Sequence, residues 1–245
     1  YLSLDPYMRG RMNDSKSYAV PQPLGQVMIG GTVGEVVDSK HPKFHVGDKV
    51  VGMGGWQTYS VVDADVPAML RKVDTTHVPI SHFLGAVGMP GVTAWHGLVR
   101  IINPKAGQTL TVSAASGAVG SAFGALAKAR GCRVVGFAGG KDKCDYVVNE
   151  LGFDACIDYR ADGLFKSLRA ACPEGVDVYF DNVGGVILET ALNLMNERGR
   201  VVCCGAISQY ESTAPTGPRN LPGAIVVKRL RMEGFIVMDW AHNDA

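Results

Sequence analysis

Residues 109–120 read Thr-Leu-Thr-Val-Ser-Ala-Ala-Ser-Gly-Ala-Val-Gly, and this stretch decides the fold. Its first half is short, apolar and β-branched, as in a buried strand. It then turns through an A-x-x-G-x-x-G pattern formed by Ala114, Gly117 and Gly120. The apolar residues that follow recur at helical spacing, at Val119, Ala122, Phe123 and Leu126. The stretch therefore predicts a strand, a tight glycine turn and a helix, which begin a βαβ unit.

The same alternation continues along the chain. Further short apolar runs predict strands at 133–138, 155–157, 176–180 and 200–204. Between them, apolar residues at helical spacing predict helices over 144–151, 164–172 and 186–195. Parallel strands need crossover connections, and those connections are right-handed. We therefore predict an α/β fold, a Rossmann-type doubly wound parallel sheet with helices on both faces.

The first third of the chain has a different pattern. Strand-like runs at 26–37 and 49–53 are interrupted by Gly and Pro every few residues. This is typical of an irregular, mainly antiparallel β domain. We place the division near residue 85, with part of the irregular β domain over 1–85 and the α/β domain over 86–245.

Composition excludes several classes of protein. Twenty-four basic residues stand against 23 acidic ones, and no run of Lys and Arg exceeds two, so a nucleic-acid partner is not expected. No stretch of 18 apolar residues occurs and the start does not resemble a signal peptide, which favours a cytoplasmic protein without a membrane partner. The six cysteines form no C-x-x-C pair and are expected to be reduced core residues.

The glycine turn fits a dinucleotide. Gly117 lets the backbone approach a pyrophosphate, Gly120 lets the helix pack closely on the strand, and the amides that open the helix face the anion. At the end of the second strand, where an acidic residue would hold the ribose of NAD, the chain has Gly139-Gly140-Lys141-Asp142-Lys143. Small residues and two lysines favour the 2′-phosphate of NADP; the alternative is a solvated helix start in which the lysines have no partner.

Polar residues follow three of the later strands. They are Tyr159, Asp181 to Gly185, and Cys204 to Tyr210. Since ligands of parallel sheets bind beyond the carboxyl ends of the strands, the three clusters together indicate one cofactor cleft, although each alone could be ordinary turn chemistry.

A metal site is not predicted. The six histidines are scattered, and none lies at ligand spacing with a pair of cysteines. His41 and His45 are four residues apart, but Pro42 between them places the pair in a loop. The remaining chemistry is that of a nicotinamide and a proton donor.

Five blocks of sequence carry a resemblance to a known family. They are Leu2–Met12, Gly88–Ala94, Ala114–Ser121, Phe180–Gly185 and Cys204–Tyr210. The chain resembles, over nearly all of its 245 residues, the zinc-independent branch of the medium-chain dehydrogenase/reductase superfamily that contains prostaglandin, plant double-bond and bacterial curcumin reductases. The resemblance implies a GroES-like substrate domain before the Rossmann domain. It also implies that the chain is truncated at both ends, with the final strand and helix of the nucleotide domain beyond its end.

The resemblance also implies roles for individual residues. The pyrophosphate would be held by Gly117, Ala118, Val119 and Gly120, and the 2′-phosphate by Lys143, a choice over Lys141 that spacing alone does not make. Thr93 would approach the nicotinamide amide. Further cofactor contacts would come from Tyr159, Asn182, Cys204, Gly205, Ala206, Ile207, Ser208, Tyr210, Phe235, Ile236 and Val237.

The function expected from this resemblance is NADPH-dependent reduction of carbon–carbon double bonds conjugated to a carbonyl, in a small-molecule enone or alkenal. Tyr210 is the first candidate for the hydroxyl that stabilises the enolate, and Tyr7 the second; either could instead be a packing aromatic. The alternatives are a quinone reductase of the same superfamily and a catalytically silent NADPH-binding protein. A homodimer is expected, while the physiological substrate is left open.

Overall fold

The computed structural model describes residues 1–14, 16–66, 69–212, 214 and 216–240. The chain forms two compact units, Tyr1–Met89 and Pro90–Ala245. The division lies four residues beyond the one expected from sequence.

Unit 1 contains a small antiparallel sheet and little other regular structure. Its strands pair in the order β1-β2-β3, with Val33 opposite Val51. The elements of this unit are α1 (Met8–Arg11), β1 (Thr32–Glu35), β2 (Lys49–Gly52), β3 (Leu70–Lys72) and the 3₁₀ turn η1 (Ile80–Leu84). The strand expected over 26–37 is therefore only four residues long. Gly30, Gly31 and the prolines before them leave too little alternating sequence for more.

Unit 2 contains a six-stranded parallel sheet with the strand order β6-β5-β4-β7-β8-β9. The strands are β4 (Thr109–Val112), β5 (Arg133–Ala138), β6 (Ala155–Asp158), β7 (Val176–Asp181), β8 (Met195–Cys203) and β9 (Arg231–Gly234). The order reverses between β4 and β7, which is the switch point where such sheets bind their ligands. The sequence predicted five strands, and the sixth, β9, was not expected.

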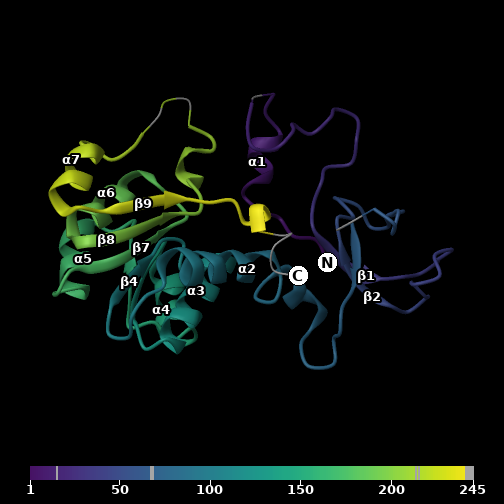
Figure 1. The fold of residues 1–245 in the computed structure, drawn as a ribbon, viewed down its shortest axis with the longest axis horizontal. Coiled ribbons are helices and arrows are strands. Elements are labelled where there is room, and N and C mark those ends of the chain that lie inside the picture. Colours follow the sequence, from purple (N-terminus) through teal and green to yellow (C-terminus); the bar gives the residue numbers. More distant parts are fainter. Residues whose placement is uncertain (15, 67–68, 213, 215, 241–245) are drawn as a thin grey trace. The chain divides into compact units, whose positions relative to one another are not determined.

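Helices cover both faces of this sheet, as expected, and Figure 1 shows α3 and α4 on one side of the strands and α6 and α7 on the other. They are α2 (Met89–Trp95) with its π-helical continuation η2 (His96–Ile102), α3 (Ala118–Ala129), α4 (Lys141–Asn149), α5 (Leu164–Ala171), α6 (Gly185–Leu194) and α7 (Leu221–Lys228), with the 3₁₀ turns η3 (Ile207–Gln209) and η4 (Val237–Trp240).

Two buried clusters hold the layers together, and the alternation of strand side chains divides them. Val178 and Phe180 of β7 face the cluster that includes η2, α3 and α4. Tyr179, between them, faces the cluster that includes α5 and α6. In the part of the chain that the structure describes, no helix is long and apolar enough to cross a membrane.

Candidate functional site

The turn between β4 and α3 presents backbone amides at the start of a twelve-residue helix. Gly117 caps the helix in an extended conformation, and its carbonyl accepts a hydrogen bond from the Ser121 amide at 2.9 Å. The amides of Ala118, Val119 and Gly120 come before this first helical bond, so they are the orphan donors that suit an anion.

The second glycine of the turn is required by close packing. A Cβ on Gly120 would overlap the carbonyl oxygen of Ala114 and lie 2.9 Å from the Cα of Ala115. Ala114 itself adopts a φ of 51°, in the left-handed region that disfavours a side chain. The helix start is thus pressed against the end of β4, which leaves a backbone cradle free of side chains.

A buried carboxylate organises the end of β7. Asp181 is only 2% exposed, and its Oδ1 accepts hydrogen bonds from the Tyr179 hydroxyl at 2.7 Å and the Ser113 hydroxyl at 3.1 Å. The same oxygen accepts the amides of Val183 at 3.0 Å and Gly184 at 2.9 Å. Burial, and next the charge of Asp181, raise the pKa of Tyr179 well above its usual value, so this phenol stays a donor.

Ser113 links this end of β7 to the glycine turn. Its hydroxyl accepts the amide of Asn182 at 2.8 Å, while the Asn182 side chain donates to the Ser113 carbonyl at 2.8 Å. The predicted cofactor residue Asn182 is therefore fixed beside the start of the phosphate turn.

The loop after β8 rests on the loop after β7. The amide of Cys204 donates to the Asp181 carbonyl at 2.8 Å, and the Ser208 hydroxyl donates to the Val183 carbonyl at 2.6 Å. The half-buried Tyr210 turns back on its own loop, where its hydroxyl accepts the Ala206 amide at 3.4 Å. The residues predicted from Cys204 to Tyr210 thus form one loop next to Asn182.

Cys204 is a neutral thiol in this loop. Burial, and next the charge of Asp181, raise its pKa to about 12. All six cysteines of the chain are free thiols, and a group with so high a pKa is a poor nucleophile at neutral pH. Cys204 can contribute shape and apolar surface here, but not a thiolate.

The turn after β5 lies against the end of β6. The Asp158 carboxylate accepts the amides of Gly140 at 2.8 Å and Arg160 at 2.9 Å, and these hydrogen bonds hold its pKa below the usual value. The Tyr159 hydroxyl is 2.8 Å from the point where a Cβ on Gly139 would stand. The two predicted regions, the glycine pair and Tyr159, therefore meet.

The two lysines of this turn are in different situations. Lys141 pairs with Asp145, one turn further along α4. Lys143 is exposed, and among the described residues it makes no ion pair. The structure therefore distinguishes the two lysines, and it leaves Lys143 the more available for a phosphate.

An aromatic cluster joins α2 and η2 to the segment after β9. His96 is buried and stacks on Trp240, with ring centroids 4.8 Å apart. Trp240 packs in turn against Phe235, with centroids at 5.7 Å. Thr93 is buried three residues before His96, and Ile236 and Val237 lie between Phe235 and Trp240 in the sequence. Sequence analysis singled out Thr93 and Phe235 but missed His96 and Trp240, whose spacing carries no recognisable motif.

Tyr7, the second catalytic candidate, belongs to unit 1. It is half-buried, and the guanidinium of Arg11 lies 5.9 Å from its ring centroid. Burial, and next the charge of Asp5, raise the pKa of Tyr7, so its hydroxyl keeps its proton at neutral pH.

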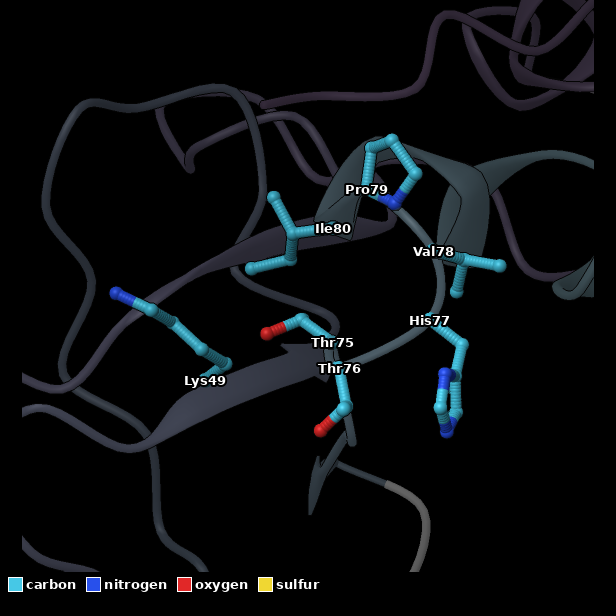
Figure 2. A pocket seen from close by; sticks show the side chains of 7 residues that line it. All are labelled: Lys49, Thr75, Thr76, His77, Val78, Pro79 and Ile80. Atoms are coloured by element: carbon cyan, nitrogen blue, oxygen red, sulfur yellow. The ribbon is translucent and has the colours of Figure 1, made fainter.

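Unit 1 also has an open surface hollow of about 460 Å³, shown in Figure 2. Lys49 of β2 and the segment from Thr75 to Ile80 line it. No residue of the predicted site is among them. The hollow therefore shares no residue with the predicted site.

No metal centre is found in the described part of the chain. Within it, no three side chains of His, Cys, Asp or Glu are grouped so that they could hold a metal ion. His41, considered as a ligand from its spacing, instead contacts Asp65 at 3.1 Å.

Comparison with known proteins identifies relatives of nearly the whole chain. A family model described as "N-terminal domain of oxidoreductase" matches residues 1–71, and one described as "Zinc-binding dehydrogenase" matches residues 118–244. The chain is 47% identical to the NADPH-dependent curcumin reductase of Escherichia coli (strain K12), over 99% of this chain and 71% of that protein. It is 44% identical to the 2-alkenal reductase (NADP(+)-dependent) of Nicotiana tabacum, over 99% of this chain and 70% of that protein.

A solved structure is also similar. The crystal structure of CurA in complex with NADPH from Vibrio vulnificus superposes with a TM-score of 0.89 and 45% sequence identity, over 97% of this chain and 71% of that one. The chain thus spans about 70% of the length of these three relatives.

Proposed function

The chain belongs to the medium-chain dehydrogenase/reductase superfamily, in the branch of curcumin, 2-alkenal and prostaglandin reductases, and from this premise we propose that it reduces conjugated double bonds with NADPH. The substrates are α,β-unsaturated ketones and aldehydes. The observation that carries the proposal is the identity of 40–47%, over nearly the whole chain, to relatives named for reduction of such compounds.

The residues present fit NADP(H). A Cβ on Gly120 would collide with the Ala114 carbonyl, so glycine lets α3 begin this close to β4, and the first amides of the helix suit a pyrophosphate. Glycine at position 139 likewise lets the turn after β5 approach the Tyr159 hydroxyl, a polar group that suits a 2′-phosphate. We assign the pyrophosphate to Gly117, Ala118, Val119 and Gly120, and the 2′-phosphate to Lys143 with Tyr159. We assign binding of the nicotinamide end of the cofactor to Thr93, Asn182, Cys204–Tyr210 and Phe235–Val237. When bound, NADPH supplies the hydride for the β-carbon of the substrate.

The protein's own contribution is a hydroxyl for the carbonyl oxygen. Negative charge develops on that oxygen as the double bond is reduced, and a donor placed there stabilises the transition state. The Tyr210 oxygen accepts the Ala206 amide, so its own O–H remains free to donate to a substrate. Tyr210 is therefore the first candidate, and Tyr7, which keeps its proton, is the second.

One assay tests the reaction. Purified protein is mixed with NADPH and either an aliphatic enone or a quinone, the absorbance of the reduced nicotinamide is followed, and the product is identified by mass. We expect oxidation with the enone and a product whose carbonyl is intact. Turnover with the quinone alone indicates a quinone reductase instead, and tight NADPH binding without any turnover indicates a silent binding protein.

We further propose a homodimer that works in a reducing compartment such as the cytoplasm. Two features of the described residues support the first part: β9 is the last strand of the sheet, and Val226 and Val227 on α7 are 72% and 68% exposed. Six free thiols support the second. Sedimentation of the protein as a monomer at micromolar concentration would contradict the dimer.

A further inference from the structure

Arg160, which sequence analysis did not consider, lies beside the glycine pair after β5. Its Nε is 3.0 Å from the point where a Cβ on Gly139 would stand. Ala138 and Asp158, one residue before Gly139 and two before Arg160, are partners in the β5–β6 register. The side chain of Arg160 therefore reaches across from the end of β6 to the turn assigned to the 2′-phosphate.

The backbone at this point is fixed. A single oxygen of Asp158 accepts the amide of Gly140 and the amide of Arg160, so the two turns are tied to each other through one atom. These two hydrogen bonds fix where the Arg160 side chain begins, next to the turn that contains Gly139. The guanidinium is therefore within reach of a phosphate bound at that turn.

The charges around the turn call for a second cation. Lys141 is engaged by Asp145, while Asp142 and Asp158 add negative charge close by. Lys143 alone would then face a phosphate dianion in the presence of two carboxylates. Arg160 makes no ion pair in the part of the chain that the structure describes, although its guanidinium lies 5.9 Å from the Tyr159 ring centroid.

We propose that Arg160 is a second cationic ligand of the 2′-phosphate and that, together with Lys143, it sets the preference for NADPH over NADH. The planar guanidinium donates two parallel N–H bonds to phosphate oxygens, whereas the Lys143 ammonium acts as a point charge. The inference rests on the proposed NADPH-dependent function and adds a specificity residue to it.

The experiment measures binding without turnover. Dissociation constants of the intact protein are determined by calorimetry for 2′,5′-ADP and for 5′-AMP, which differ only in the 2′-phosphate, and by nicotinamide fluorescence for NADPH and NADH. The variants are Arg160→Ala, Arg160→Lys and Arg160→Ala with Lys143→Ala. Arg169→Ala, which removes an exposed arginine on α5, is the matched control.

We expect Arg160→Ala to weaken 2′,5′-ADP and NADPH roughly 10- to 100-fold and to change 5′-AMP and NADH less than about threefold. Arg160→Lys should recover part of the loss, because lysine restores the positive charge but not the two parallel N–H donors of the guanidinium. The double variant should lose less than the product of the single losses, since both cations act on one phosphate. Arg169→Ala should behave as wild type.

Two results would overturn the inference. Equal weakening of 2′,5′-ADP and 5′-AMP would mean that the guanidinium stacks on the adenine, and unchanged binding would mean that it stays in solvent. Failure of the proposed function is distinct: the wild-type protein would then bind 2′,5′-ADP no better than 5′-AMP. An unchanged Tm of each variant shows that the fold is intact.

Discussion

Two aspartates that end parallel strands of the same sheet each accept hydrogen bonds from two nearby backbone amides, but they differ in burial. Asp181 ends β7 and accepts the amides of Val183 and Gly184; Asp158 ends β6 and accepts those of Gly140 and Arg160. Asp181, however, is buried and also accepts two hydroxyls, whereas Asp158 is only half-buried.

Because of this difference in burial, we expect the two regions at the carboxyl ends of the strands to have different roles. At the carboxyl ends of β4 and β7, the buried groups of Asp181, Ser113 and Tyr179 fix the backbone, so a change there should disturb both stability and the shape of the predicted site. At the β5–β6 edge, the charged groups are exposed and contribute little to stability. They remain available to bind the 2′-phosphate that distinguishes NADPH from NADH, as we propose.

The largest expected effect tests this contrast directly. Asp181→Ala leaves the Tyr179 and Ser113 hydroxyls and two amides without their acceptor in a buried site, which should lower the free energy of unfolding by about 3–5 kcal/mol and the Tm by roughly 10 °C. Asp158→Ala, which removes the half-buried counterpart, should lower Tm much less. Thermal unfolding followed by circular dichroism checks both, and equal falls in Tm would abolish the distinction between the two edges.

The next effect concerns chemistry at the buried edge. Tyr210→Phe keeps the ring and deletes only the hydroxyl, so kcat for an enone should fall about 10- to 1000-fold, because the lost donor acts in the transition state. KM for NADPH should change little. Steady-state kinetics with both substrates measures the split.

Wild-type turnover in the Phe variant would reduce Tyr210 to a wall of the cleft. Tyr7→Phe is the matched variant in that case. If Tyr7→Phe lowers kcat and Tyr210→Phe does not, the hydroxyl that stabilises the enolate belongs to Tyr7 of unit 1.

Parts of the chain also differ in how well their secondary structure was predicted from the sequence. The strands and helices from 109 to 204 were predicted because burial on both faces of a parallel sheet forces apolar runs, and helical spacing marks the crossovers. β9 was missed, since Arg231-Met-Glu-Gly is a half-exposed edge strand without an apolar run. The helical segment from Met89 to Ile102 was missed because Pro90, Gly91 and Gly97 argue against a helix. Gly97 is needed there, as a Cβ would strike the Phe180 ring.

Within the predicted site, sequence motifs identified the glycine turn after β4 but not the side chains that hold the neighbouring backbone in place. Asp181 was noted only as part of a polar loop, and its partner Ser113 is 68 residues away. Such contacts are tertiary and leave no local pattern. The ion pair of Lys141 with Asp145 was readable from their i, i+4 spacing and could have favoured Lys143 without any resemblance.

A smaller effect is expected at the exposed edge. If Lys143 contacts the 2′-phosphate, Lys143→Ala removes a charge-assisted contact of about 1.5–3 kcal/mol and should raise KM for NADPH roughly 10- to 150-fold. KM for NADH should stay nearly constant, because NADH has no charge at that position. Lys141→Ala, the matched variant, should have little effect because Asp145 already engages that lysine. Equal effects of Lys143→Ala on both cofactors would remove Lys143 from the site.

The smallest effect tests whether the buried edge stores backbone strain. Ala114 has a φ of 51°, and its carbonyl accepts a hydrogen bond from the Gly117 amide at 2.9 Å, so the surrounding turn fixes a conformation that costs an alanine about 1 kcal/mol. Ala114→Gly relieves that cost but loses about 0.5–1 kcal/mol to the greater freedom of glycine in the unfolded chain. The net change should be a gain of at most about 0.5 kcal/mol, seen as a Tm that is unchanged or raised by about 1–2 °C. Ala125→Gly, at an exposed position inside α3 where alanine is unstrained, should instead lower stability by about 0.5–1 kcal/mol. If both substitutions lower Tm alike, Ala114 carries no strain, and the fixed geometry of the buried edge must then come from the hydrogen bonds of Asp181 and Ser113 alone.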